Sequence, residues 1–206
     1  MTHSLTTAEC VPRTGTDLLR IVRINEEIKR VVGVSVKINI MALNAIFLAK
    51  RAGTAARGFG VLSNEFRVFS QDLRTAMETL TGLVYGCVNE VSVMLQDSRF
   101  TRLLQEAGQL APQAALTGIL QRRADKNAAH REKLSALRRQ LQRALEDAFQ
   151  MVELGGVLAK SAKIEAAYGQ AFAAPLAQVS GEFDRIIEEI RASLEALRRS
   201  AFFTGH

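Results

Sequence analysis

The chain has 206 residues, of which 48% are apolar and only 6% are aromatic, and its formal net charge is +6 at pH 7. No run of eighteen uncharged apolar residues occurs, so the sequence predicts no membrane span, and the chain is long enough to bury a core of its own. Three prolines, no tryptophan and many helix-forming residues exclude a sheet protein and indicate an all-α fold.

The first residues look unlike an ordered element or a leader. Residues 1–15 mix Thr, Ser, Gly and Pro without periodicity, which predicts a loose N-terminal arm. They also lack the basic and apolar segments of a signal peptide. We therefore expect a cytoplasmic protein.

A first helical hairpin is predicted over residues 16–97. Thr16 or Asp17 can cap its opening helix, Gly53 and Gly58 bracket a turn, and a return helix runs to Asp97. Both helices carry heptad seams of apolar or small residues, which Glu90 interrupts. The opening seam is Ile21, Ile24, Ile28, Val31, Ser35, Ile38, Ala42, Ala45, Ala49 and Ala52, and the return seam is Phe59, Leu62, Phe66, Phe69, Leu73, Ala76, Leu80, Leu83, Cys87 and Met94.

This hairpin has more apolar surface than two helices can bury. The flank that needs covering is Val32, Val34, Phe47, Val84, Val88, Val91 and Val93. Residues 98–115 read as a connector, a short helix or a loop, remote from the turn. Residues 116–203 then predict a second hairpin with its turn near Gly169 to Ala174. Together they predict a long antiparallel four-helix bundle with both turns at the same end.

The second hairpin resembles a decayed copy of the first. Residues 179–184, Val-Ser-Gly-Glu-Phe-Asp, align with residues 62–67, Leu-Ser-Asn-Glu-Phe-Arg. The alternative is chance similarity between heptad helices. We favour an internal duplication in which one chain supplies all four helices and folds as a monomer rather than a homodimer.

The most informative stretch lies around the first turn. It reads Asn39-Ile40-Met41-Ala42-Leu43-Asn44-Ala45, then Arg51-Ala52-Gly53, Arg57-Gly58-Phe59-Gly60-Val61 and Glu65-Phe66-Arg67. This pattern resembles the hairpin tip of methyl-accepting chemotaxis receptors, whose cytoplasmic signalling domain is an antiparallel coiled coil that pairs into a four-helix bundle. The resemblance implies a soluble signalling protein that contacts the chemotaxis histidine kinase and its coupling adaptor, or other chemoreceptors.

The resemblance also implies where partners bind. The candidate residues are Asn39, Ile40, Asn44, Phe47, Leu48, Arg51, Arg57, Val61 and Glu65. Leu48 and Thr54 stand where the receptors carry glutamates. In the receptors, the glutamate at the Leu48 position helps three dimers associate, so the resemblance does not imply trimer formation here. We instead expect an apolar spot formed by Ile40, Phe47 and Leu48. The alternative for the polar residues is structural: Asn44 fixes the register, Arg51 and Arg57 cap or pair at the turn, and Glu65 makes a surface ion pair.

No pattern indicates catalysis, a metal or a cofactor. The sequence has no phosphate loop and no nucleophile motif, and His3, His130 and His206 are far apart. We therefore expect no enzyme and no cofactor, with Cys10 and Cys87 as reduced thiols.

Two questions of function stay open at this stage. The basic stretch 122–143 is predicted to be a solvated helix face, because no aromatic residues are interleaved with its charges. The alternative is a surface that binds an acidic partner, a membrane surface or nucleic acid. The alternative to a chemoreceptor-like module is a structural or regulatory bundle that kept the receptor scaffold without kinase control. A basic nucleic-acid-binding bundle is the third reading.

Overall fold

The computed structural model describes residues 14–107 and 113–199, and within these ranges every residue except Tyr168 and Gly169 is helical. The all-α prediction is therefore confirmed. The elements are α1 (Thr14–Ala52), the 3₁₀ turn η1 (Gly53–Ala56), α2 (Arg57–Ala107), α3 (Gln113–Ala167), the 3₁₀ turn η2 (Gln170–Phe172) and α4 (Ala173–Arg199).

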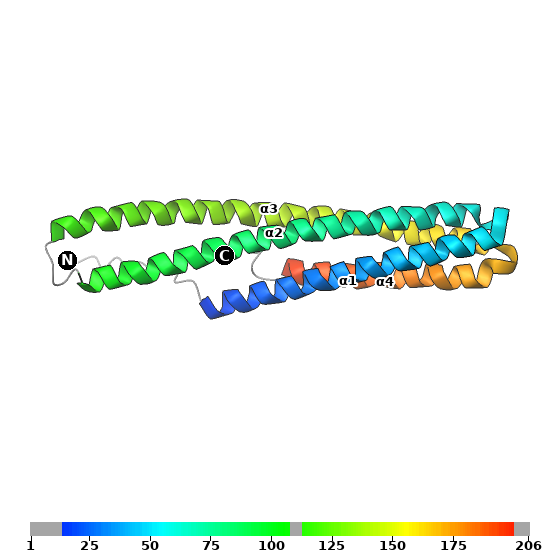
Figure 1. Ribbon diagram of the computed structural model, residues 1–206, viewed down its shortest axis with the longest axis horizontal. Helices are drawn as coiled ribbons and strands as arrows, with labels where there is room; N and C mark the ends of the chain where they lie inside the picture. Colours follow the sequence, from blue (N-terminus) through cyan, green and yellow to red (C-terminus); the bar gives the residue numbers. More distant parts are fainter. Residues whose placement is uncertain (1–13, 108–112, 200–206) are drawn as a thin grey trace, which may run out of the picture.

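The helices form a long antiparallel bundle (Figure 1). Helix α2 packs against α1 and α3, and α4 packs against α3 and α1, so the helices are neighbours in chain order and close into a ring. Both hairpin turns lie at the same end of the rod, as predicted. We call this end the tip.

The predicted seams form the core. Every seam position of α1 from Ile21 to Ala49 is buried, and the largest side chains fully enclosed between the helices include Phe59, Phe66 and Phe183. The sequence analysis missed a second row of core positions, because four helices around one core bury a wider stripe of each helix than a two-helix seam does. This row comprises Met77, Leu145, Val152, Ala159, Ala166, Ile187 and Leu194.

Aligned positions of the two hairpins meet across this core. The rings of Phe66 and Phe183 stack with their centroids 3.9 Å apart and their planes 6° from parallel. Ser63 and Ser180 are also aligned, and both are buried with the hydroxyl donating to a backbone carbonyl of the same helix. The hairpins therefore face each other with matching residues, which is the geometry expected of paired copies.

The helix boundaries differ from the predicted segments. Helix α1 begins at Thr14, within the predicted arm, and residues 1–13 lie outside the described residues. The predicted connector over 98–115 is mostly helix, because α2 continues to Ala107 and α3 begins at Gln113. Residues 108–112, and residues 200–203 of the predicted second hairpin, are outside the described ranges.

A contact between α2 and α3 explains why α2 does not stop at Asp97. Arg123 of α3 lies 3.3 Å from the Asp97 carboxylate, and its guanidinium lies 4.1 Å from the centre of the Phe100 ring. A cation held over an aromatic face and paired with a carboxylate stabilises both helices at this level.

The second hairpin covers most of the predicted flank. Val34 and Val84 are buried, and Val32, Val88 and Val91 pack against the core. The prediction is wrong for Phe47, whose side chain is 65% exposed.

One stretch passes a test for membrane spans by length and composition. Within Ile21–Glu106, an eighteen-residue window has a mean hydropathy of 1.9, and 33% of that window is buried. Residues 31–48 of α1 have this character because they carry both the buried seam and exposed residues such as Val36 and Ile40. A core helix of a bundle passes the same test.

Candidate functional site

The tip of the first hairpin is built on one residue with unusual backbone geometry. Gly53 has φ +71°, a left-handed conformation that glycine adopts without a Cβ clash, and it ends α1. The following 3₁₀ turn places Ala56 in the core with no exposed surface. Arg57 then begins α2, so the turn is shorter and more regular than the predicted Gly53 to Gly58 loop.

Small residues let the backbones approach closely at the tip. A Cβ added at Gly60 would lie 3.4 Å from the Ala49 Cβ, so α1 and α2 are in contact there. A Cβ added at Gly58 would collide with the Glu165 carboxylate of α3. The two hairpin tips therefore touch each other.

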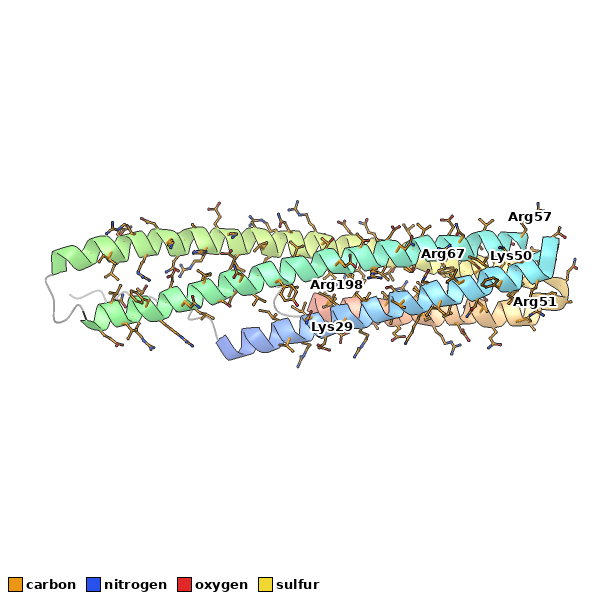
Figure 2. The ribbon with its side chains drawn as sticks, viewed as in Figure 1. Lys29, Lys50, Arg51, Arg57, Arg67 and Arg198 are labelled. Atoms are coloured by element: carbon orange, nitrogen blue, oxygen red, sulfur yellow. The ribbon has the colours of Figure 1, made fainter. Side chains whose placement is uncertain are left out.

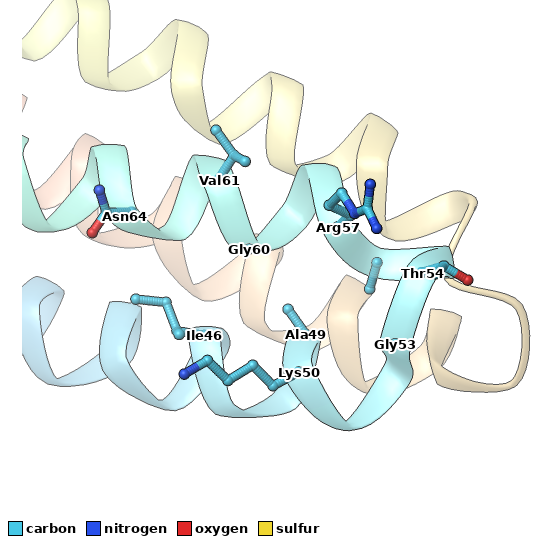
Figure 3. Close-up of a pocket in the computed structure, with 10 residues that line it drawn as sticks. Ile46, Ala49, Lys50, Gly53, Thr54, Arg57, Gly60, Val61 and Asn64 are labelled. Atoms are coloured by element: carbon cyan, nitrogen blue, oxygen red, sulfur yellow. The ribbon is translucent and has the colours of Figure 1, made fainter.

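A groove of about 550 Å³ runs between α1 and α2 at the tip (Figure 3). Ala49, Ala56 and Gly60 leave its floor free of long side chains, and Lys50 and Arg57 are its charged residues. The full lining is Ile46, Ala49, Lys50, Gly53, Thr54, Ala56, Arg57, Gly60, Val61 and Asn64. The groove is thus mainly apolar with a positive rim.

Beside the groove, α1 presents an exposed stripe. Ile40 and Phe47 are 54% and 65% exposed, and Asn44 and Arg51 are also exposed. Because steps of three and four residues keep side chains on one helix face, these residues form one surface. We call this surface the α1 stripe.

The remaining predicted residues divide between different surroundings. Arg57 and Val61 line the groove, and Glu65 is exposed on α2. Asn39 is half-buried, and Leu48 packs partly against the core. The expected apolar spot therefore includes Ile40 and Phe47, but Leu48 faces inward.

Sequence reasoning missed several residues of this region. Val36 and Leu43 are exposed and extend the α1 stripe at heptad spacing, 36, 40, 43 and 47. This second set of apolar residues at heptad spacing could have been recognised in the sequence, next to the buried seam. Lys50 and Asn64 line the groove, and only the way α1 and α2 pair brings them together.

The tip is positively charged. Lys50, Arg51 and Arg57 gather there in Figure 2. Among the described residues, no acidic side chain forms an ion pair with any of these three. Their field therefore favours an acidic partner surface.

A second polar cluster lies far from the tip. Glu90 of α2 is only 3% exposed, and its carboxylate pairs with Lys133 and with His130 Nδ1, the latter at 2.8 Å. These two hydrogen bonds, first that of Lys133 and then that of His130, hold the pKa of Glu90 below its ordinary value. The predicted interruption of the seam is thus a paired buried charge.

Cys87 is the one cysteine among the described residues, and it is buried. Burial raises the pKa of the Cys87 thiol, which keeps it protonated, and Cys10 lies outside the described ranges. Within the described part of the chain, no group of three or more His, Cys, Asp or Glu side chains could hold a metal ion.

Comparison with known proteins points to one kind of relative. The chain is 28% identical over 82 residues to the sensory transducer protein YvaQ of Bacillus subtilis and 30% identical over 86 residues to the methyl-accepting chemotaxis protein PctB of Pseudomonas aeruginosa. It is 36% identical over 69 residues to methyl-accepting chemotaxis protein IV of Escherichia coli. No family model matches the chain.

These similarities are local. They cover 39%, 40% and 34% of this chain, and only 14%, 14% and 13% of the respective relatives. The chain thus contains a region similar to methyl-accepting chemotaxis proteins.

Proposed function

We propose that this protein is a chemoreceptor-like signalling module whose tip engages the chemotaxis histidine kinase and its coupling adaptor, or other chemoreceptors. One observation carries the proposal. The receptor-like motif folds as the tip of a rod, with the α1 stripe and the groove side by side on its surface.

The chemistry of the tip supports protein binding. Exposed Ile40, Phe47 and Val61 can bury apolar area against a partner, at about 1.5–3 kcal/mol for each large side chain that becomes fully enclosed. Lys50, Arg51 and Arg57 add a positive rim. An apolar centre with a charged rim is the usual composition of a specific protein interface.

A binding assay with purified kinase and adaptor tests the proposal. Ile40→Arg and Val61→Glu should each abolish co-purification with the full-length chain, because each places a charge in the proposed contact. The matched control is Leu154→Glu, since Leu154 is 66% exposed on α3 and belongs to neither the groove lining nor the α1 stripe. Equal binding by all three variants, with helicity unchanged, would exclude the tip as the contact.

We further propose that the protein is a cytoplasmic monomer. One chain supplies all four helices of the core, so folding needs no second subunit. Its mass should stay that of one chain on dilution to low micromolar concentration, with unchanged helicity. A two-chain mass that survives dilution would show a dimer.

A second candidate is a structural or regulatory bundle without kinase control. Leu48 favours this second candidate. It packs partly against the core, and it carries no charge for the contact that the corresponding receptor glutamate makes. In that case the tip variants would change association with other chemoreceptors while kinase activity stayed constant.

A further inference from the structure

Among the described residues, the end remote from the tip consists of two helices. Helices α2 and α3 continue past the start of α1 and the end of α4 (Figure 1). We call residues 94–106 of α2 and 117–129 of α3 the two-helix extension. A pair of helices leaves one side of each helix without a covering neighbour.

The contact between the helices of the extension is mixed: Asp97 pairs with Arg123, and Leu104 and Leu120 are half-buried. Three other large apolar side chains are exposed: Phe100 by 49%, Leu103 by 57% and Ile119 by 38%. Arg123 lies over the Phe100 ring, whereas Leu103 and Ile119 do not pack against the described core.

The three exposed apolar side chains lie on one face. Phe100 and Leu103 are three residues apart on α2, and Arg123 of α3 lies against the Phe100 ring. Ile119 is four residues before Arg123, which places it one turn further along the same side of α3. We call Phe100, Leu103 and Ile119 the remote face.

The charge around the remote face is positive. Its nearby acids are engaged: Asp97 by Arg123, Glu106 by Arg102 and Asp125 by the amide of Gln121. Among the described residues, three other exposed cations nearby form no ion pair with an acid: Arg99, Arg122 and Lys126.

We propose that the remote face binds an amphipathic helix with acidic flanks, supplied by a partner protein. Such a helix would lie along α2 and α3 as a third helix, with its apolar residues on Phe100, Leu103 and Ile119 and its carboxylates beside Arg99, Arg122 and Lys126. A second copy of this chain is disfavoured, because it would bring like charges together. The inference is independent of what binds at the tip.

A synthetic peptide tests this directly. The probe is a helix of about three heptads with leucine at the a and d positions and glutamate at the flanking positions, labelled for fluorescence anisotropy. It should bind the full-length protein, and its affinity should fall as salt rises. A peptide with the same leucines and lysine flanks should not bind; equal binding by both peptides would overturn the proposal.

Substitutions test whether the peptide binds at the remote face. Leu103→Glu and Arg122→Glu should each weaken peptide binding by about tenfold or more, because each removes an attraction and adds a repulsion. Leu154→Glu makes the same change at a similarly exposed leucine of the four-helix region and should leave binding unchanged. Circular dichroism checks that all three variants keep their helicity.

Three other outcomes would overturn the proposed occupant. Tighter binding of a single-stranded oligonucleotide than of the acidic peptide would assign the face to nucleic acid. Binding to anionic vesicles that Leu103→Glu abolishes, without peptide binding, would assign it to a membrane surface. Self-association that Leu103→Glu abolishes would assign it to a second copy of the chain.

Discussion

The region near the tip and the region around Glu90 hold the same helices together by different means. Near the tip, small residues and stacked rings fill a core enclosed by four helices, as at Phe66 and Phe183. Around Glu90, the α2 to α3 contact includes a buried carboxylate that pairs with Lys133 and hydrogen-bonds with His130. The difference shows that a buried charge joins apolar side chains such as Cys87 and Leu134 in pairing α2 with α3 there.

Truncating the ring stack should have the largest effect. Phe183→Ala removes a fully buried ring, and we expect a loss of about 3–5 kcal/mol in the free energy of unfolding. Urea unfolding followed by circular dichroism measures it. A double-mutant cycle with Phe66→Ala should give a coupling of about 0.5–1.5 kcal/mol, and additive losses would mean that the rings do not interact.

Two glycines of the bundle should respond in opposite directions. A Cβ at Gly155 would lie 2.8 Å from Phe69 and from Ile187, so Gly155→Ala should destabilise by about 1–3 kcal/mol. Gly82 is helical with open space around it, so Gly82→Ala should stabilise by about 0.5–1 kcal/mol. A Gly155→Ala variant that is as stable as the parent would contradict the described packing of α3, and a destabilised Gly82→Ala variant would contradict the open space on α2.

The Glu90 cluster should make stability depend on acid pH. Because its folded pKa is lowered, its contribution is present above the unfolded carboxyl value of about 4.3 and is lost as pH falls through the folded value. As the pH is lowered through this range, the midpoint temperature of thermal unfolding should fall less steeply for Glu90→Gln than for the parent. Glu78→Gln, an exposed carboxylate paired with Arg74, is the matched control and should leave the slope unchanged.

The smallest effect is expected at the surface. Arg74→Ala breaks an exposed pair with Glu78 and should change stability by no more than about 0.5 kcal/mol. Arg138 would not serve as such a surface control. The basic stretch 122–143 was predicted to be a solvated face, but Arg138 is half-buried. A change above about 1 kcal/mol for Arg74→Ala would mean that surface pairs contribute to the rod's stability.

Heptad spacing alone predicted much of the fold, including the all-α class, the seam from Ile21 to Ala49 and the shared end of the turns. It could not give the second core row at Met77 and Leu145, because that row depends on how many helices surround the core. Nor could it end α2 correctly, since Arg123 and Asp97 meet only when α3 folds back.

The site was less predictable than the fold. The motif located the tip, where Ile40 and Phe47 are exposed. Whether Leu48 points outward or inward depends on the neighbouring helix, and the groove depends on the pairing of Ala49 with Gly60. Such features follow from contacts between helices, which the order of residues within one helix does not specify.

The length of α2 has a consequence for how the two ends of the rod can influence each other. Its 51 residues span about 76 Å at about 1.5 Å per residue. Charges in physiological salt are screened over about 8 Å, so the potential at one end is not felt at the other. Any message between the ends must travel as a displacement, a rotation or a change in stiffness of continuous helices.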